Sequence, residues 1–318
     1  MILVTGATGF VGSYLLCHLV EKNTYPVALY RSDKKKNSIR SIFESKFSDG
    51  KSQFEKIIWR KGDLTNFPSL EEAFHGITKV YHCAAMISFS QRKTKKLIEI
   101  NEQGTSYIVN LCLSCKVNKL IYISSIAALG KEESNTNVDE DTPWDNNKEK
   151  NPYAYSKYGA ETEVWRAGQE GLEFCIVNPG IILGKGSPAN FILNKIKKGL
   201  RYYTSGNNGY VHVSDVVSVM YQLMESEIKG ERFILVAENW TNKFLSQFLL
   251  KKNEKIYLIP KFTFYLLWIV EYFLELIFFR KRKLTRALIE GMYEQKNIMG
   301  DKIKTRLDFS YTPIEEIL

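Results

Sequence analysis

The stretch that decides the fold is residues 2–12, which read ILVTGATGFVG. Its apolar start predicts a strand and its end opens a helix, and between them three glycines have the spacing G-x-x-G-x-x-G. Such a loop makes a tight turn, lets the backbone approach a pyrophosphate and packs the helix closely on the strand. The helix N-terminus adds free N–H groups and the positive end of its dipole. We therefore expect a dinucleotide to bind here, at Gly6, Thr8, Gly9, Phe10, Val11 and Gly12.

Outward from this loop, short apolar runs alternate with longer amphipathic runs. The apolar runs predict strands at residues 2–4, 27–30, 56–59, 80–83, 120–124 and 174–177. The amphipathic runs predict helices at residues 11–21, 70–74, 95–115 and 154–169. This alternation implies right-handed crossovers and a parallel sheet that is covered on both faces. The expected fold class is α/β, with a Rossmann doubly wound parallel sheet.

The alternation loosens after about residue 178, where glycines become frequent. We therefore expect residues 1–177 to form a dinucleotide-binding domain. Residues 178–318 are expected to form mainly a small C-terminal lobe for the substrate, with some elements that return to the first domain.

Composition narrows the class of protein. With 44% hydrophobic and 25% charged residues, the 318-residue chain is typical of a globular protein, which excludes a disordered or fibrous one. The net charge is +9, but the lysines are scattered, and Lys34, Lys35 and Lys36 are interpreted as part of a solvated loop. No nucleic-acid-reading motif is recognised, so we expect no nucleic-acid partner.

Cysteine usage and the start of the chain indicate the compartment. The five cysteines are odd in number and loosely spaced, so no disulfide framework is expected. Cys112 and Cys115 are interpreted as small core residues of a helix, and no metal site is expected. Because Met1 is followed at once by an apolar strand and not by a basic segment, we expect no signal peptide and a cytoplasmic protein.

The end of the second predicted strand indicates which dinucleotide binds. Arg31 lies 31 − 12 = 19 residues after Gly12, where an acidic residue would bind the ribose hydroxyl of NAD. An arginine there favours the 2′-phosphate of NADP, since a guanidinium suits bidentate phosphate contact. We expect NADP as the cofactor and regard NAD as the weaker alternative.

A proton-transfer set is predicted around Tyr153. Asn151 and Pro152 suit the cap and the first position of a helix, which would place Tyr153 and Lys157 one turn apart on one face. A nearby ammonium stabilises a phenolate, so we expect Lys157 to lower the pKa of Tyr153 toward neutrality. Upstream, the strand at residues 120–124 runs into two serines at the end of the sheet where open α/β folds present catalytic groups.

Together these residues resemble the extended short-chain dehydrogenase/reductase family, of the NAD(P)-dependent epimerase/dehydratase type. The resemblance covers nearly the whole chain. It rests on TGATGFVG at 5–12, GDL at 62–64, HCAA at 82–85, Asn101, the serine pair at 124–125, Tyr153-x-x-x-Lys157, NPG at 178–180 and VHVSDV at 211–216.

The resemblance implies roles for residues that spacing alone does not identify. It implies that Ser125, Tyr153 and Lys157 are catalytic and that Lys157 also holds the nicotinamide ribose. It implies further cofactor contacts at Asp63 and Leu64 (adenine), Cys83, Ala84 and Ala85 (middle of the cofactor), and Pro179 and Ile182 (nicotinamide). Asn101 matches a helix asparagine of the family, which we interpret as mainly structural.

The residues after the serine pair point to a branch of the family. They are Ile126, Ala127, Ala128 and Leu129, without the acidic pair that is typical of nucleotide-sugar dehydratases. They resemble the dihydroflavonol-4-reductase and 3β-hydroxysteroid dehydrogenase branches, which implies a reductase acting on apolar ketones and secondary alcohols. Two alternatives stay open, a nucleotide-sugar epimerase of the same family and a binding protein that senses NAD(P) without chemistry.

A late hydrophobic segment at residues 262–279 reads FTFYLLWIVEYFLELIFF, and the basic run Arg280-Lys281-Arg282-Lys283 follows it. We expect a helix that is barely long enough to cross a bilayer and that carries two glutamates, which argue against a simple span. Three interpretations stay open. The helix lies in a membrane interface through residues 262–283, at the inner face of the membrane, or it covers the pocket or the core, or it forms a homodimer.

Overall fold

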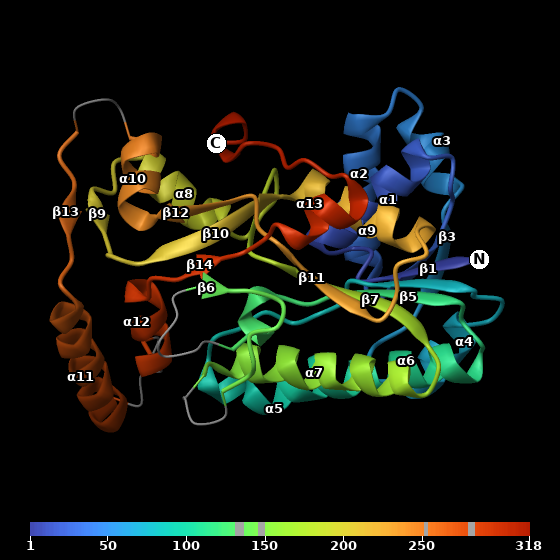
Figure 1. The fold of residues 1–318 in the computed structure, drawn as a ribbon, viewed down its shortest axis with the longest axis horizontal. Helices are drawn as coiled ribbons and strands as arrows, with labels where there is room; N and C mark the ends of the chain where they lie inside the picture. Colours follow the sequence, from blue (N-terminus) through green and yellow to red (C-terminus); the bar gives the residue numbers. More distant parts are fainter. Residues whose placement is uncertain (131–136, 146–149, 251–253, 279–283) are drawn as a thin grey trace.

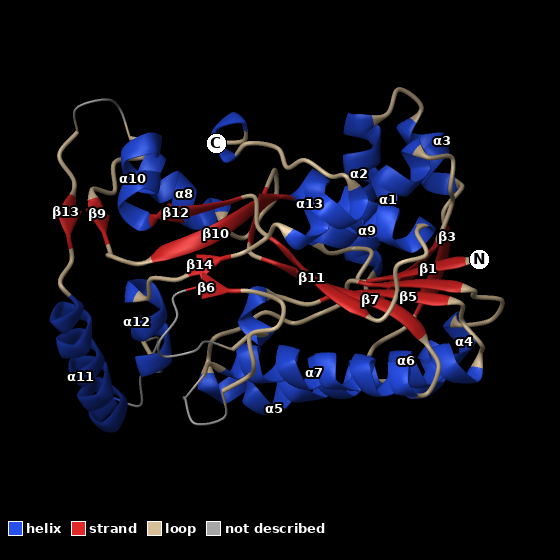
Figure 2. Cartoon of the chain, in the orientation of Figure 1, coloured by secondary structure: helices blue, strands red, loops and turns tan. Residues whose placement is uncertain are grey.

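The centre of the fold is a parallel sheet of seven strands. The computed structural model describes residues 1–130, 137–145, 150–250, 254–278 and 284–318. The strand order is β11-β7-β5-β4-β1-β2-β3, and all neighbouring strands in it are parallel (Figures 1 and 2). The strands are β1 Ile2–Thr5, β2 Val27–Tyr30, β3 Ile58–Lys61, β4 Lys79–His82, β5 Lys119–Ile123, β7 Glu173–Pro179 and β11 Glu231–Leu235. The predicted Rossmann doubly wound sheet is confirmed.

Helices cover both faces of this sheet, as Figure 1 shows. On one face lie α1 Phe10–Glu21, α2 Asp33–Lys46, α3 Gly50–Glu55, α9 Val213–Glu225 and α13 Lys302–Leu307. On the other face lie α4 Phe67–Ala73, α5 Thr94–Leu97, α6 Gly104–Ser114 and α7 Pro152–Gln169. Each face has its own apolar core, because strands buried on both sides are apolar on both sides.

The strands at the centre of the sheet begin and end close to their predicted bounds, but the edge strand β3 does not. It covers Ile58–Lys61, two residues later than predicted, and pairs with β2 from Val27 opposite Ile58. Ile57 is buried, but it lies between the end of α3 and the first residue of the strand.

Two local predictions are wrong. Lys34, Lys35 and Lys36 belong to helix α2 and not to a loop, because Ile39 and Phe43, four residues apart, bury one side of that helix. Cys115 is exposed at the end of α6, where the chain leaves the core, so only Cys112 of that pair is a core residue. The five cysteines are all free.

The helical segment predicted at residues 95–115 is interrupted. A π-helical turn, η2 Ile98–Gln103, lies between α5 and α6. Such turns are rare, often occur at functional sites, and change the direction of the side chains they carry. Here the turn carries Asn101, which is buried.

The chain after β7 forms a smaller lobe and also returns to the main sheet. The lobe has a three-stranded sheet, β12-β10-β8, and a small apolar core of its own. The return is made by α9, β11 and α13, of which β11 adds the last strand beside β7. The elements of the lobe are β8 Ile181–Leu183, α8 Asn190–Lys197, β9 Tyr202–Tyr203, β10 Asn207–His212, β12 Glu238–Thr241, α10 Asn242–Leu249, β13 Tyr257–Leu258, α11 Lys261–Phe278 and α12 Arg286–Tyr293.

Short elements complete the described chain. Two of them, β6 Asn137–Val138 and β14 Asn297–Ile298, pair with each other between the lobe and the main sheet. The others are the turns η1 Gln91–Lys93, η3 Ile126–Ala128 and η4 Ile314–Glu316.

The late hydrophobic segment forms α11, at the edge of the molecule farthest from the N-terminus (Figure 1). Residues 279–283, which include the basic run, lie outside the described residues, as does the side chain of Glu275. Within the described ranges, no helix is both long and apolar enough to cross a membrane.

Candidate functional site

The glycine loop after β1 is shaped by its neighbours. Gly6 has φ +64°, and its carbonyl oxygen accepts a hydrogen bond from the Gly9 amide at 2.8 Å. A Cβ at Gly6 would come within 2.6 Å of the Ala84 amide nitrogen, and one at Gly12 would collide with the Gly6 carbonyl. Both positions therefore require glycine, as the predicted tight turn and close helix packing demand.

The first turn of α1 is open to an anion. Its N-cap is Gly9, with extended backbone, and no side chain caps the N–H groups. The first turn also carries no acidic residue. Uncapped N–H groups and the positive end of the helix dipole suit a pyrophosphate, so these residues fit a dinucleotide. Thr8, Phe10 and Val11 are half-buried around this turn.

Arg31 and Asp63 lie together at the carboxyl ends of β2 and β3. Their charged atoms are 3.4 Å apart, and the Arg31 side chain is 62% exposed. Partial burial raises the pKa of Asp63, but hydrogen bonds from Thr65 and the charge of Arg31 outweigh it and hold the pKa below its ordinary value. An exposed pair of this kind is weak, so the guanidinium can exchange Asp63 for another anion.

The segment after β4 is held by a buried chain of hydrogen bonds. The Ala84 amide donates to Thr5 Oγ1 at 3.3 Å, and that oxygen lies 2.6 Å from His82 Nδ1. On the other side of the ring, His82 Nε2 lies 3.0 Å from Thr105 Oγ1, which donates to the Asn101 carbonyl. Burial, helped by the charge of Lys157, lowers the pKa of His82 to about 3, so its imidazole is neutral.

Asn101 fixes the same segment from the π-helical turn. Its side-chain oxygen accepts from the Met86 amide at 2.7 Å, and its Nδ2 donates to the Met86 carbonyl at 2.9 Å. The same Nδ2 also lies 2.9 Å from Ser156 Oγ in α7. These contacts place Cys83 and Ala84, half-buried, and Ala85, exposed, between the glycine loop and α7.

Tyr153 and Ser125 form the polar centre of the site. Asn151 caps α7 through a bond of 2.8 Å from the Ala154 amide, and Pro152 is the first residue of the helix, as predicted. Tyr153 follows and is nearly buried, and the nearby Ser125 side chain acts to lower its pKa. Ser125 itself begins the turn η3 directly beyond β5 and accepts from the Ala127 amide at 3.1 Å.

The prediction that Lys157 lowers the pKa of Tyr153 is wrong in this structure. Burial raises the pKa of Tyr153 to about 12, and the nearby Ser125 side chain only partly offsets that increase. The Lys157 ammonium faces elsewhere. Its Nζ donates to Tyr122 Oη at 2.6 Å and to the Ile123 carbonyl at 2.8 Å, with the Tyr122 ring centre 4.3 Å away.

Burial also changes Lys157 itself. It lowers the pKa of Lys157 to about 7, against the attraction of Glu161, one turn further along α7. Beside it, burial raises the pKa of the Cys83 thiol to about 12. Lys157 is thus a cation that loses its proton easily, held between the ends of β4 and β5.

A second buried group under the site was missed from the sequence. Glu161 accepts from Asn178 Nδ2 at 2.5 Å and from Arg232 Nη1 at 3.3 Å, and it is nearly inaccessible to solvent. Asn178 also donates to the Ser125 carbonyl at 3.0 Å, so this network holds the serine in place. Burial raises the pKa of Glu161, while the bonds from Asn178 and Arg232 oppose that shift.

Phe89 was missed as well. Its ring packs edge-on against Tyr153, with 6.0 Å between the ring centres, and it is 46% exposed. Nothing in its spacing singles it out, because it belongs to the irregular segment after β4. It gives the surroundings of Tyr153 an apolar wall.

The remaining predicted cofactor residues lie in or just beyond strands of the two sheets. Leu64 is buried behind β3 and Pro179 ends β7, while Ile182 lies in β8, half-buried, opposite Val211 of β10. The structure therefore places Tyr153 near Ser125, whereas the Lys157 ammonium, one turn further along α7, contacts Tyr122 and the Ile123 carbonyl. Arg31 and Asp63 form a separate pair at the carboxyl ends of β2 and β3.

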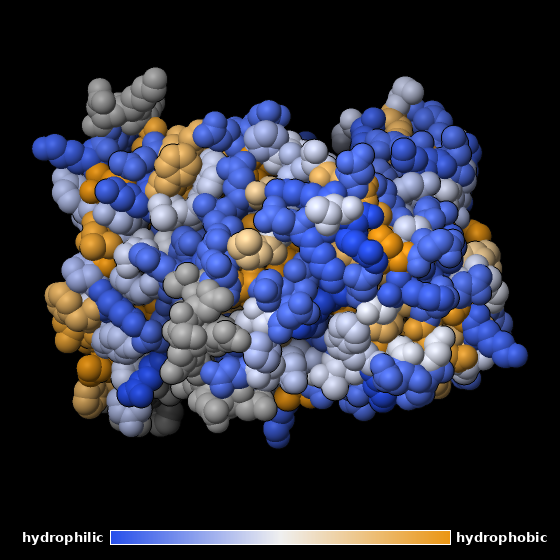
Figure 3. Space-filling view, in the orientation of Figure 1, coloured by the Kyte–Doolittle hydropathy of each residue, from blue (hydrophilic) through white to orange (hydrophobic). Residues whose placement is uncertain are grey.

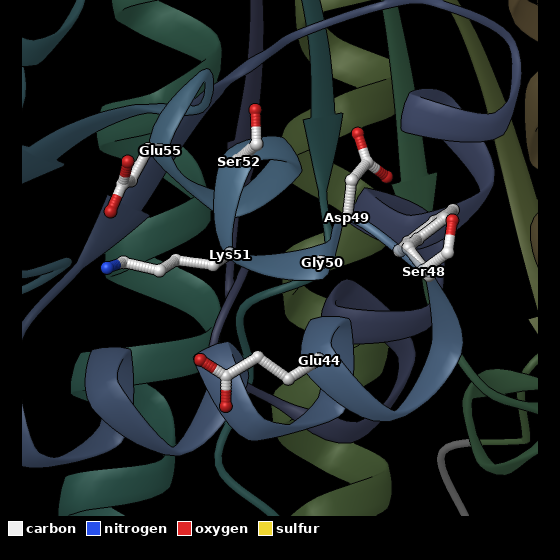
Figure 4. A pocket seen from close by; sticks show the side chains of 8 residues that line it. Glu44, Ser48, Asp49, Gly50, Lys51, Ser52 and Glu55 are labelled. Atoms are coloured by element: carbon white, nitrogen blue, oxygen red, sulfur yellow. The ribbon is translucent and has the colours of Figure 1, made fainter.

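The described part of the chain has a hollow away from these residues. A shallow hollow between α2 and α3 is lined by residues such as Glu44, Asp49 and Lys51 (Figure 4), and none of the predicted site residues lines it. No group of three or more His, Cys, Asp or Glu side chains among the described residues could hold a metal ion.

Comparison with known proteins places this geometry among relatives. The sequence model of the NAD dependent epimerase/dehydratase family matches residues 2–236. The dihydroflavonol 4-reductase of Gerbera hybrida is 25% identical over 333 residues, covering 99% of this chain and 88% of that protein. Cinnamoyl-CoA reductase 1 of Petunia hybrida is 27% identical over 250 residues, covering 74% of this chain and 72% of that protein. The crystal structure of gox2253 superposes with a TM-score of 0.79 at 26% identity, covering 100% of this chain and 95% of the other.

Proposed function

The chain belongs to the NAD dependent epimerase/dehydratase family of NAD(P)-dependent enzymes, and from this premise we propose that it is an NADP-dependent reductase. The reaction is the reduction of a ketone, or in reverse the oxidation of a secondary alcohol, on an apolar small molecule. The observation that carries the proposal is the buried Tyr153, which lies near Ser125 at the carboxyl end of β5 and one turn before Lys157.

Each member of this set has a role in the reduction. When bound, the dinucleotide supplies the hydride that the carbonyl carbon accepts. Tyr153 donates its phenolic proton to the carbonyl oxygen, which becomes the hydroxyl of the product. Ser125 holds that oxygen by a hydrogen bond, and Lys157 holds the ribose of the cofactor.

The state of Tyr153 suits the reductive direction. With a pKa raised to about 12 by burial, the phenol is protonated throughout the physiological pH range and ready to donate. Lys157, with a pKa lowered to about 7, can give and take a proton near neutrality.

The preference for NADP rests on Arg31. Its guanidinium is exposed at the end of β2 and is paired only weakly with Asp63, so it is available to a ribose phosphate. Within this proposal Asp63 and Leu64 border the adenine, Cys83 to Ala85 line the middle of the cofactor, and Pro179 and Ile182 flank its nicotinamide.

The preference for an apolar substrate rests on Phe89 and on the relatives. Phe89 packs on Tyr153 and is partly exposed, so a substrate oxygen that reaches Tyr153 has an aromatic ring beside its carbon skeleton. The relatives named above are both called reductases. In this proposal residues 1–177 bind the dinucleotide, and residues 178–318 mainly form the lobe that encloses the substrate.

The alternative is a nucleotide-sugar epimerase, since the family includes epimerases by name. Hydride would then leave the substrate and return to it, with no net use of the cofactor. The test is a screen of apolar aromatic and alicyclic ketones against nucleotide sugars, with NADPH absorbance as the readout. We expect net oxidation of NADPH with at least one ketone. Interconversion of a nucleotide sugar without net oxidation would replace the reductase with the epimerase.

A further inference from the structure

The outward face of α11 is apolar and exposed to solvent. Phe262, Leu266, Ile269, Val270 and Phe273 recur at the spacing of one helix face and are 64%, 57%, 42%, 52% and 54% exposed. None of the described side chains of this helix is fully buried. In Figure 3 apolar side chains gather at the margin of the molecule that α11 occupies in Figure 1. We call these five residues the outer stripe.

Several polar side chains of the same helix contact α12 and the residues just before it. Lys261 Nζ lies 2.5 Å from Glu290 of α12, and the Tyr265 hydroxyl bonds to the same carboxylate. Further along, Glu271 accepts from the Leu284 amide at 2.9 Å, and Arg286 lies over the Trp268 ring at 4.8 Å. This helix therefore exposes its apolar side to solvent. A surface helix of a water-soluble protein usually exposes its polar side.

The exposed apolar surface continues beyond the helix. Tyr202 of β9 and Tyr257 and Leu258 of β13 are 56%, 51% and 49% exposed. Figure 1 shows β9, β13 and α11 along one edge of the molecule. Exposed apolar side chains gathered along one edge in this way indicate a partner, since water-soluble surfaces seldom carry them in such number.

Charge identifies the kind of partner. The chain continues from α11 into Arg280-Lys281-Arg282-Lys283, and its net charge is +9. Four consecutive cations beside an apolar, aromatic stripe match a surface with anionic headgroups over hydrocarbon. A second copy of the chain would bring the same cations and an outer stripe that holds no carboxylate to neutralise them.

We propose that α11 docks the protein on an anionic lipid membrane, with the outer stripe in the headgroup–acyl boundary. The helix lies in the plane of the interface. It does not span the bilayer, in keeping with the absence of a long, apolar helix from the described residues. Tyrosines at an interface satisfy both phases at once, which suits Tyr202 and Tyr257.

The test is flotation of the full-length protein with vesicles in a density gradient. We expect flotation with vesicles of phosphatidylcholine and phosphatidylglycerol in equal parts. Flotation should be weak with phosphatidylcholine alone, and salt should reduce binding to the anionic vesicles. The triple variant Leu266→Ser, Ile269→Ser and Phe273→Ser should bind these vesicles at least about tenfold more weakly. Replacement of residues 280–283 by glutamine should weaken binding by on the order of a hundredfold.

A matched pair of single variants isolates the helix. Ile269→Ser should reduce flotation, whereas Ile58→Ser should not. Ile58 is the same residue type, 45% exposed, in the edge strand β3. Because the outer stripe does not enter the core, the thermal unfolding midpoint of the triple variant should stay unchanged, which separates lost binding from lost folding.

Three outcomes would overturn the proposal. One is failure of the wild-type protein to float with anionic vesicles. Another is flotation that the triple variant retains in full. The third is a wild-type dimer in light scattering that becomes a monomer in the triple variant, without flotation of either, which would make a second copy the occupant. None of these measurements depends on whether the enzyme is a reductase.

Discussion

Around Tyr153 the chain buries polar groups, whereas along α11 it exposes apolar ones. The buried ammonium of Lys157 and carboxylate of Glu161 are each held by named partners, including Tyr122, Asn178 and Arg232. The outer stripe of α11 stays 42% to 64% exposed, and the ring that Phe273 contacts, Tyr272, belongs to the same helix. Burying charge costs stability, and exposing apolar surface gives up the gain from burial. Features that lower stability are expected where they serve a function. We therefore interpret the surroundings of Tyr153 and the outer stripe of α11 as two functional regions of different kinds.

The largest change in stability should follow the loss of charge at Glu161. Glu161→Gln leaves Arg232 facing a neutral amide in a buried site, so we expect the free energy of unfolding to fall by about 3 kcal/mol. Urea unfolding measures it. Glu163→Gln is the matched control, because Glu163 is a partly exposed carboxylate of the same helix that pairs with Arg166. It should cost less than about 0.5 kcal/mol. An equal fall in the free energy of unfolding for both variants would contradict the claim that the burial of Glu161 makes its charge more important than that of Glu163.

Glu161→Gln also has a signature that a packing defect lacks. Because Glu161 raises the pKa of Lys157, its loss should move the neutral limb of the pH–rate profile toward lower pH. An unchanged profile would limit Glu161 to a structural role.

Stability should next depend on pH through Lys157. Its pKa is about 7 in the fold against 10.5 for an ordinary lysine. Between these values the unfolded chain holds a proton that the folded protein has lost, so stability rises with pH. We expect a gain of about 2 kcal/mol from about pH 7 to about pH 8.5 in wild type relative to Lys157→Met. Urea unfolding of both proteins across this window isolates Lys157, since the cysteines titrate in both. A constant difference would contradict the lowered pKa.

Arg31 should affect only the choice of cofactor. Arg31→Ala should weaken NADPH binding by roughly tenfold or more, through the loss of a charge-assisted contact to phosphate, and leave NADH binding unchanged. Fluorescence titration with each nucleotide measures both. Because the pair with Asp63 is exposed, the melting temperature should not move. Equal loss for NADH and NADPH would remove the assignment to the ribose phosphate.

The smallest effect is expected at α11. Phe273→Ser should change the free energy of unfolding in water by no more than about 0.5 kcal/mol, because that side chain is 54% exposed. A Phe in a core would cost several times more when truncated. Urea unfolding of the wild type and of Phe273→Ser measures this difference. A loss of that larger size would show that the outer stripe packs against the protein and would remove the contrast between the two regions.

The sequence predicted the parts of the fold that depend on local pattern. Strands such as β2, an apolar run between polar turns, have the predicted bounds, and Asn151 caps α7 as its residue type suggests. The sequence pattern predicted the wrong structure where contacts between distant parts of the chain determine the bounds of an element. The edge strand β3 moved by two residues because its register with β2 fixes it, and α2 formed around only two buried side chains, Ile39 and Phe43.

The candidate site shows the same division. Tyr153 and Lys157 could be found because one helical turn separates them. Their pKa values could not, because those depend on burial and on groups far upstream in the chain, Ser125 for Tyr153 and Cys83 for Lys157. Phe89 and Glu161 were missed for the same reason, since neither has a neighbour in the sequence that reveals its partner in space.

The central claim is that Tyr153 donates the proton in an NADPH-dependent reduction. The most direct test is turnover of the best ketone from the screen by Tyr153→Phe, with NADPH binding measured on the same protein. The account predicts a fall in kcat by about a hundredfold to ten-thousandfold, with NADPH affinity unchanged. Turnover equal to that of the wild-type enzyme, with the cofactor still bound, would contradict it.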